Sequence, residues 1–240
     1  MKCIILAAGY ATRMYPLTEN FPKPLLEVGG KAILDWLTED LSPAVEEFIV
    51  ISNHKYAAYF EKWAEGKPVT VVDDGTESNE TRLGAVCDIQ FAIDQLGLKD
   101  DLLILAGDNV LDFSLRSFVE YGRSKGTSCT MRYWEEDENK LHRAGVSEVE
   151  GEKLTGFEEK PAEPKSHWCT PPFYYYVSTD AAKIRDAIAD GCGTDAPGSL
   201  VAWMCIRSPM HSMVMPGKRY DIGNMESYLR IKDSYQGPNK

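Results

Sequence analysis

Two hydrophobic patterns alternate along the first half of the chain. Short continuous apolar runs predict buried strands, and longer segments with apolar residues three or four positions apart predict helices with one buried face. Strands are expected at residues 3–6, 47–52, 68–72 and 102–106, and helices at 31–41, 56–65 and 83–96. This alternation is typical of a parallel sheet with right-handed crossovers, in which ligands bind beyond the carboxyl ends of the strands.

The pattern is less regular after residue 110. Strands at 145–149 and 154–157 are expected to pair as an antiparallel hairpin around the turn at 150–153. Further helices are expected at 113–125, 180–189, 195–206 and 224–235, and further strands at 128–134 and 173–177. We therefore expect an α/β fold: a single Rossmann-like domain with a mixed, mostly parallel central sheet, helices on both faces and a small antiparallel subregion.

Charge and composition narrow the choice of partner. The chain has 240 residues, with 26 basic and 37 acidic side chains and a formal net charge of −11. No cluster of Lys and Arg offsets this charge, so a nucleic-acid polymer is disfavoured, although local cations can still hold a single nucleotide. No apolar stretch approaches the ~20 residues that span a bilayer, and the start of the chain lacks a signal-peptide core. We expect a cytoplasmic protein with no membrane partner.

Cysteine and histidine spacing does not predict a metal or disulfide site. The six cysteines lack CxxC spacing, and the four histidines are equally dispersed. A zinc site needs clustered ligands, so none is expected, and the cysteines are interpreted as reduced.

The first predicted strand is followed by a loop with little side-chain bulk. Ala7, Ala8 and Gly9 leave backbone N–H groups accessible, and Arg13 and Lys23 supply positive charge a few residues later. The loop matches neither the three-glycine dinucleotide fingerprint nor the Walker phosphate loop. It is either an ordinary surface loop or a cradle for a triphosphate. Prolines stiffen the chain around the two cations, which favours the cradle: Pro16, Pro22 and Pro24.

Two other segments each allow two interpretations. Asp108 follows the apolar strand at 102–106 after a single glycine, and there it either caps the next segment or delivers a carboxylate to the ligand-binding edge of the sheet. Gly84 follows a polar loop at 73–82 and precedes a helix. Either Thr81 caps that helix, or Gly84 lets a ligand approach the backbone closely.

The stretch from Leu6 to Leu26 resembles the signature of the sugar-1-phosphate nucleotidyltransferases. LAAGYATRMYPLT and PKPLL correspond to the family pattern GxGTR(L/M)xPLT…PKPLL, except that Ala11 stands where the family usually has its second glycine. The resemblance implies that Arg13, Lys23 and Asp108 are catalytic residues. It also implies a set of nucleotide-binding residues: Leu6, Ala8, Gly9, Ala11, Thr12, Arg13, Lys23, Asn79, Gly84 and Asp108.

The resemblance implies a magnesium site as well. In this family the aspartate of the GDN string, here Asp108, binds Mg²⁺ together with an aspartate near the end of the catalytic domain. The string RYDIG at 219–223 is similar to that second element, so Asp221 is the expected second ligand. Carboxylate oxygens suit this hard cation, which keeps water and phosphate as its other ligands.

The acceptor site is implied by the strings AGV at 144–146 and EEKP at 158–161. The resemblance assigns the sugar hydroxyls to Gly145 and Glu159 and the acceptor phosphate to Lys160, with Asn109 and Asp221 as further substrate-binding residues. Taken alone, EEKP also fits a solvated acidic turn. The whole chain, 1–240, is then one nucleotidyltransferase domain, in which residues 1–110 mainly bind the nucleotide and residues 111–235 mainly bind the sugar phosphate.

The expected reaction is Mg²⁺-dependent nucleotidyl transfer from a nucleoside triphosphate to a sugar 1-phosphate. The DAPG string at 195–198 resembles a subset of bacterial glucose-1-phosphate thymidylyltransferases, which favours glucose 1-phosphate with dTTP or UTP, although a capped helix explains the same residues. Pro172 stands where the family commonly has a glycine near the sugar. It leaves open a cytidylyltransferase acting on a non-sugar phosphate such as phosphocholine. The sequence is also compatible with a non-catalytic nucleotide-sugar sensor and, more weakly, with a metal-dependent glycosyltransferase. A homodimer is possible as well.

Overall fold

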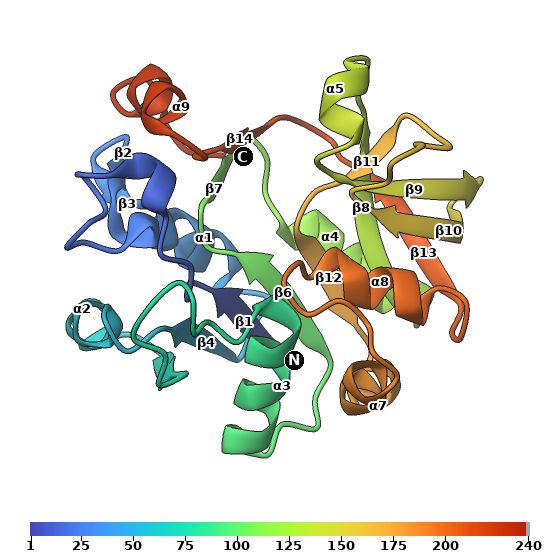
Figure 1. Cartoon of the computed structure of the whole chain (residues 1–240), viewed down its shortest axis with the longest axis horizontal. Coiled ribbons are helices and arrows are strands. Elements are labelled where there is room, and N and C mark those ends of the chain that lie inside the picture. The colour runs from blue at the N-terminus through green and yellow to red at the C-terminus, as the bar shows by residue number, and fades with distance from the viewer. Residues whose placement is uncertain (239–240) are drawn as a thin grey trace. The chain divides into compact units, whose positions relative to one another are not determined.

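The computed structural model describes residues 1–238, and the chain divides into two compact units (Figure 1). Unit 1 contains Met1, Gly84–Leu105 and Ser117–Met215, and unit 2 contains Lys2–Leu83, Ala106–Arg116 and the segment that begins at Pro216. Each unit combines segments that are distant in sequence. The expected division at residue 110 is therefore not the division between the units, and the assignment of a substrate to each half stays a prediction.

Three parallel strands in the order β1-β4-β5 form the sheet of unit 2: β1 (Lys2–Leu6), β4 (Glu47–Ser52) and β5 (Val69–Asp73). Leu6 pairs with Ile51, and Ile51 pairs with Val72, so the three strands end at the same edge. Helix α1 (Ile33–Leu41) connects β1 to β4, and α2 (Ala57–Ala64) connects β4 to β5. The loops that follow the strands are thus brought to one edge of the sheet.

A second part of unit 2 joins its three chain segments. Strand β7 (Asn109–Leu111) pairs antiparallel with β14 (Arg219–Asp221), and β2 (Glu27–Val28) with β3 (Lys31–Ala32). Helix α9 (Met225–Ile231) follows β14 and begins with a capping box at Asn224. One hydrophobic cluster includes Met14, Val110 and Ile222, so apolar packing holds the end of the chain against its beginning.

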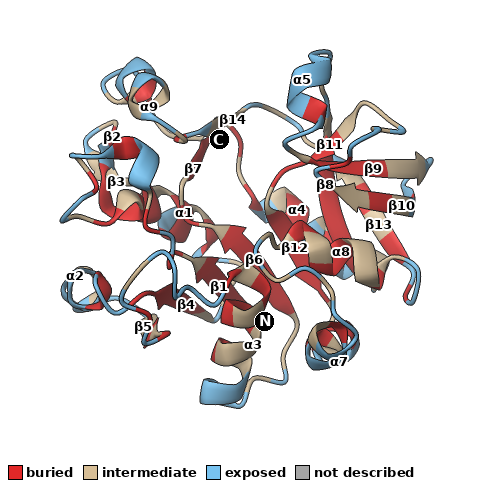
Figure 2. Cartoon of the chain, viewed as in Figure 1, coloured by how far each residue is buried: buried red, intermediate tan, exposed pale blue. Residues whose placement is uncertain are grey.

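The strands of unit 1 lie in the order β11-β9-β10-β13-β8-β12-β6. Because β11 also pairs with β8, five of them form a closed ring of hydrogen-bonded neighbours. Figure 2 shows how strongly these strands are buried. Their bounds are β6 (Leu102–Ala106), β8 (Ser128–Trp134), β9 (Gly145–Glu150), β10 (Lys153–Glu159), β11 (Trp168–Thr170), β12 (Phe173–Tyr176) and β13 (Met210–Val214).

The helices of unit 1 are mostly short. They are α3 (Ala85–Leu96), α4 (Arg116–Lys125), α5 (Glu138–Leu141), α6 (Ser178–Ala181), α7 (Ile184–Ala189) and α8 (Gly198–Met204). None of the helices within residues 1–238 is both long enough and apolar enough to cross a membrane.

The predicted α/β fold with a mixed sheet is confirmed, with more antiparallel pairing than expected. The sheet of unit 2 is parallel, whereas in unit 1 only β8 and β13 pair in parallel. The antiparallel part is larger than the small subregion that was expected, and short connections such as the β9–β10 turn join antiparallel neighbours there. The hairpin itself is confirmed. The helix expected at 180–189 is two helices, and β7, β11, β13 and β14 were not predicted, since they are short or lack a clear apolar pattern.

Candidate active site

The loop after β1 is anchored to the neighbouring strand. The N–H of Ala7 donates to the carbonyl of Ile51 (2.9 Å), and the fully buried Asn53 donates from Nδ2 to the carbonyl of Ala8 (2.8 Å). Leu6 ends β1, and Gly9 is exposed. The predicted phosphate loop therefore begins from a fixed backbone at the edge where the strands of unit 2 end.

Ala11 adopts a left-handed backbone conformation, with φ 48° and ψ 40°. Its carbonyl accepts hydrogen bonds from the hydroxyl of Thr18 (2.8 Å) and from the N–H of Met14 (2.9 Å). A residue with a Cβ atom in this region costs about 1 kcal/mol relative to glycine. The departure from the usual glycine at this position is thus accommodated, because the hydrogen bonds fix the turn.

The turn at Ala11 begins a short 3₁₀ helix, η1 (Thr12–Met14). Both Thr12 and Arg13 are exposed within it, whereas Met14 is buried in the hydrophobic cluster of unit 2. Burial of Met14 fixes the helix and leaves the cation of Arg13 accessible to a ligand.

Lys23 and Asp108 form an ion pair. Lys23 is the first residue of a second 3₁₀ helix, η2 (Lys23–Leu25), and its Nζ lies 2.5 Å from Oδ2 of Asp108. Both side chains are largely shielded from solvent, with 13% of Lys23 and 30% of Asp108 exposed. The structure thus joins a residue of the first loop to the carboxylate that follows β6, and the catalytic roles of the two residues stay predictions.

Asp221 is brought to the same place by the β7–β14 pair. It lies opposite Asn109, and the N–H of Ile222 donates to the carbonyl of Asp108 (3.2 Å). Although Asp221 is exposed overall, partial burial of its carboxyl raises its pKa, and the charge of Asp108 raises that pKa further. Arg219, Lys23 and Arg13 act in the opposite direction. Four of the charged residues predicted for the site therefore influence one another.

Asn109 connects these groups. Its Nδ2 donates to Oδ1 of Asp108 (2.7 Å), and its Oδ1 accepts from Nη1 of Arg219 (2.7 Å). Asn109 is fully buried. It therefore orients the carboxylate of Asp108 and holds the guanidinium of Arg219 beside Asp221.

The two carboxylates fit a magnesium ion. The charge of Asp108 raises the pKa of Asp221, and both carboxylates offer hard oxygen donors. No group of three or more His, Cys, Asp or Glu side chains suited to a metal occurs in residues 1–238. A site with two protein ligands suits Mg²⁺ when phosphate and water supply the rest of its coordination.

The polar loop that follows β5 packs against the phosphate loop of the same unit. The hydroxyl of Tyr10 donates to the carbonyl of Thr76 (2.9 Å), and Thr76 donates from its N–H to Oδ1 of the buried Asp74 (2.7 Å). Asn79, the weaker candidate for base contact, is exposed in the outer part of this loop. The structure therefore fixes the start of the loop and leaves Asn79 free of the protein core.

Gly84 lies in unit 1, where it precedes α3 with a φ of 92°. A Cβ atom at this position would lie 2.7 Å from the carbonyl oxygen of Thr194. The hydroxyl of Thr81 instead donates to the carbonyl of Ser78 (3.1 Å), so the interpretation of Thr81 as the helix cap is wrong. The glycine is required by its backbone conformation and by the close approach of Thr194, and base contact stays a prediction.

Unit 1 also brings together the residues predicted for the acceptor. A Cβ atom on Gly145 would lie 3.1 Å from Oε2 of Glu159, and one on Gly198 would lie 1.9 Å from it. Burial raises the pKa of Glu159, Asp195 raises it further, and Lys160 opposes this shift. The carboxylate of Glu159 thus occupies space that exists because two glycines lack side chains.

Lys160 is exposed and has a φ of 49°, which is uncommon for a residue other than glycine. Its N–H donates to the carbonyl of Ala144 (3.0 Å), which fixes this conformation beside Gly145. Pro172 precedes β12 without an N–H to offer, and the neighbouring Phe173 N–H donates back to the carbonyl of Pro171 (2.7 Å). A backbone donor toward a sugar is therefore missing at Pro172.

The sequence profile described as nucleotidyl transferase matches residues 2–237. The chain belongs to the nucleotidyl transferase family. A Sulfolobus acidocaldarius protein assigned as a mannose-1-phosphate guanyltransferase is 28% identical over 238 residues, which cover 96% of this chain and 62% of that protein. A UTP–glucose-1-phosphate uridylyltransferase from Haloferax volcanii is 29% identical over 183 residues, covering 74% of this chain and 72% of that protein. The chain thus spans less than two thirds of the length of the first of these relatives.

Solved structures agree with the chain at the level of the fold. A Bacillus anthracis protein assigned as a glucose-1-phosphate thymidylyltransferase, in complex with sucrose, has a TM-score of 0.84. The match covers 100% of this chain and 98% of that one at 22% identity. At this identity the likeness establishes the shared α/β architecture.

Two structural features of the candidate site were not predicted from the sequence. Asn53 follows the strand β4 directly, as a polar residue follows β6 at Asp108, so its position was a usable signal. Gly198 gave no such signal, because its contact with Glu159 joins residues that are distant in sequence.

Proposed function

We propose that this nucleotidyl transferase moves a nucleotidyl group from a nucleoside triphosphate to a sugar 1-phosphate, giving a nucleotide sugar and pyrophosphate. The observation that carries the proposal is the convergence of Lys23, Asp108 and Asp221 at the phosphate loop of unit 2. Glucose 1-phosphate with dTTP or UTP is the favoured pair of substrates. The names of the uridylyltransferase and thymidylyltransferase relatives support this choice.

The chemistry needs little covalent work from the protein. An oxygen of the sugar phosphate attacks the α-phosphorus, the bond from that phosphorus to the bridging oxygen breaks, and pyrophosphate leaves with the bonding electrons. The attacking oxygen is already anionic near neutral pH, so no general base is required. Lys23 and Arg13 offset the negative charge that moves from the bridge onto the leaving pyrophosphate.

The residues of unit 1 are proposed to position the acceptor. Lys160 binds its phosphate and so reduces repulsion with the triphosphate, and Glu159 accepts hydrogen bonds from sugar hydroxyls. The unusual backbone conformation of Lys160 supports this assignment, because strained residues that are held by their surroundings cluster at functional sites. Gly84 and Asn79 are the proposed contacts to the base.

Asp108 and Asp221 are the residues that would hold Mg²⁺, and the ion would supply positive charge against the triphosphate. Asn109 would keep the carboxylate of Asp108 in the orientation to bind it. The phosphates would then compete with Asp108 for the ammonium of Lys23. We expect its ammonium to turn toward the phosphates, because the metal neutralises Asp108.

The proposal is tested by pyrophosphate release from dTTP, UTP, CTP, GTP and ATP, each with glucose 1-phosphate, mannose 1-phosphate and phosphocholine. Mg²⁺-dependent release with glucose 1-phosphate and either dTTP or UTP is the expected result. Retained nucleotide binding without release for any combination would contradict an enzymatic function and favour a sensor.

A second candidate function follows from Pro172. The missing backbone donor beside β12 favours an acceptor that lacks sugar hydroxyls at that point, such as phosphocholine with CTP. Release of pyrophosphate with phosphocholine alone would select this second function. A homodimer and a cytoplasmic location remain predictions from the sequence.

A further inference from the structure

A groove lies on unit 2, between α2 and the segment that leads into η2. It has a volume of about 560 Å³, and its lining is largely apolar. Pockets that bury small molecules commonly have volumes of ~300–1,000 Å³. The residues that line it belong to no part of the proposed reaction, and six of them carry the argument: Phe21, Leu25, Ala58, Tyr59, Lys62 and Trp63.

Aromatic rings line part of the groove. Phe21 and Tyr59 meet edge to face, with their ring centroids 5.4 Å apart and an interplanar angle of 77°. Tyr59 nevertheless remains 41% exposed. Exposed aromatic rings of this kind favour a ligand with a flat apolar body, because contact between them removes apolar surface of both the ligand and the protein from water.

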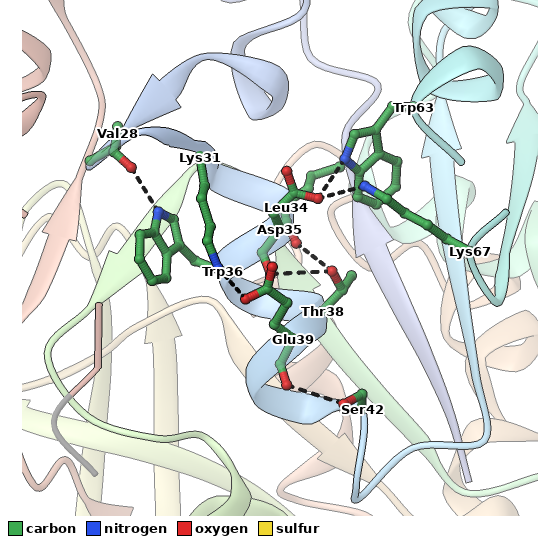
Figure 3. Close-up of polar contacts among 10 residues, drawn as sticks. All are labelled: Val28, Lys31, Leu34, Asp35, Trp36, Thr38, Glu39, Ser42, Trp63 and Lys67. Carbon is green, nitrogen blue, oxygen red and sulfur yellow. Dashed lines mark hydrogen bonds and ion pairs between the residues drawn. The ribbon is translucent and has the colours of Figure 1, made fainter. Parts of the chain in front are cut away.

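Trp63 is fixed in place from α1. Its Nε1 donates to Oδ1 of Asp35 (2.9 Å), and the same oxygen accepts from Nζ of Lys67 (2.6 Å). Figure 3 shows both side chains converging on the carboxylate of Asp35, and Nζ of Lys67 lies 4.1 Å from the centroid of the Trp63 ring. The ring is thus preorganised, and a ligand loses little free energy in ordering it.

Among residues 1–238, Lys62 is the one cation that lines the groove. Ala58, Tyr59, Lys62 and Trp63 are spaced so that they share one side of α2. Within the described residues 1–238, Lys62 makes no ion pair or hydrogen bond with its side chain, unlike Lys67. Its ammonium is therefore available to an anionic group of a bound ligand, and that group selects the ligand by charge.

The groove shares an element with the candidate active site. Phe21 lies two residues before Lys23, and Leu25 belongs to the same 3₁₀ helix as Lys23. The turn is tight, since the N–H of Leu25 donates to the carbonyl of Pro22 (3.1 Å). Movement of Phe21 or Leu25 by a ligand therefore moves the backbone that carries Lys23 and its ion pair with Asp108.

We propose that this groove binds a small ligand with a flat apolar body and one anionic group, and that its occupancy changes turnover through η2. The apolar walls bind the body and Lys62 binds the anion. The effect on turnover rests on the proposed nucleotidyl transfer, whereas binding itself does not. Phe21 and Leu25 are positioning residues in this scheme, because they act through Lys23.

Binding is tested with two fluorescent probes that share an aromatic body. 1-Anilinonaphthalene-8-sulfonate carries one anionic group, and N-phenyl-1-naphthylamine carries none. We expect saturable binding of one sulfonate probe per folded full-length chain, about threefold to tenfold tighter than the uncharged probe. Binding that does not saturate, or equal affinity for both probes, would overturn the assignment.

Two variants and their controls locate the probe. Lys62→Met keeps the aliphatic stem and removes the charge, so it should bring the two affinities within about twofold of each other. Lys153→Met, at an exposed lysine that begins β10, should leave the preference unchanged. Ala58→Phe should fill the groove and weaken both probes at least tenfold, whereas Ala189→Phe, at the exposed end of α7, should not. Unchanged binding in both groove variants would place the probe elsewhere.

The coupling to turnover is measured with the sulfonate probe at saturation. We expect pyrophosphate release by the wild-type chain to change at least twofold, through kcat or the KM of the triphosphate, and Ala58→Phe to be insensitive to the probe. Saturable binding with unchanged turnover would overturn the coupling. A chain with no turnover at all would contradict the proposed function but not the groove, because the affinities are measured without catalysis. If probe binding is lost as the protein concentration rises and the chain self-associates, the groove is instead an interface with a second copy of the chain.

Discussion

Asp221 lies opposite Asn109 in the β7–β14 pair, and this pairing brings the carboxylate of Asp221 into the electrostatic field of Asp108. The two aspartates are distant in sequence, and the hydrophobic patterns of the segments that carry them do not indicate that they meet. Partial burial of the carboxyl raises the pKa of Asp221, and the charge of Asp108 raises it further; a metal ion would relieve both effects.

Stability should depend on pH through Asp221. Its pKa is raised in the folded protein, so ionisation of this carboxyl opposes folding. As the pH rises from about 4, the ordinary value of an aspartate, through the raised pKa, the free energy of unfolding of the wild type should fall relative to Asp221→Asn. Urea unfolding of both proteins across this range, with a chelator present, measures the difference. A wild-type free energy of unfolding that stays constant or rises relative to that of Asp221→Asn as the pH increases would contradict the assigned pKa direction.

Ala11→Gly should not destabilise the protein, unlike an ordinary Ala→Gly substitution. Ala11 has a φ of 48°, a conformation that glycine adopts without steric cost, so we expect the free energy of unfolding to stay unchanged or rise by up to about 1 kcal/mol. Ala202→Gly, in the helix α8, should lower it by about 1 kcal/mol. Chemical denaturation compares the two, and an equal loss in both would show that Ala11 is unstrained.

Gly84→Ala should be more damaging than substitution of a glycine with the same sign of φ in open space. The new Cβ atom would lie 2.7 Å from the carbonyl oxygen of Thr194, so a loss of about 2–3 kcal/mol in the free energy of unfolding is expected. Gly66 has a φ of +75° with no atom near its Cβ position. Gly66→Ala should therefore lose only about 1 kcal/mol. Similar losses for the two variants would remove the packing explanation for Gly84.

Gly198→Ala should weaken the acceptor site selectively. Its Cβ atom would lie 1.9 Å from Oε2 of Glu159 and must displace that carboxylate. We expect the KM for the sugar phosphate to rise about tenfold or more, with the KM for the triphosphate changed less than twofold. Ser199→Ala, at the next position, is the matched control and should leave both constants near wild type. An unchanged KM for the acceptor would argue against binding by Glu159.

The sequence allowed prediction of the parts of this molecule that depend on local pattern. The strands at β4, β6 and β8 have the bounds expected from their apolar runs, and the β9–β10 hairpin follows from its turn residues. The family signature identified Lys23 and Asp108, which the structure joins. The side chains that form this ion pair were thus both identified from the sequence as site residues, although the ion pair itself was not predicted.

Other features depend on packing between distant segments, which local pattern does not encode. The β7–β14 pair is too short to have a periodicity, although it places Asp221 beside Asn109. Gly198 lies against the side-chain carboxylate of Glu159, and Gly84 lies against the backbone carbonyl of Thr194, so both contacts join segments that are distant in sequence. The left-handed conformation of Lys160 is likewise imposed by its surroundings, since a lysine has no intrinsic preference for it.

The most direct test of the account is pyrophosphate release by the wild type and by Asp108→Asn, titrated with Mg²⁺ in the presence of glucose 1-phosphate and dTTP or UTP. Removal of this carboxylate should reduce release at saturating Mg²⁺ by a factor of about 100 or more, while circular dichroism shows an intact fold. Glu226→Gln, on the exposed side of α9, should behave as wild type. Wild-type release by the folded Asp108→Asn protein, or release that does not depend on Mg²⁺, would contradict the central claim that Asp108 and Asp221 form the metal site of a nucleotidyl transferase.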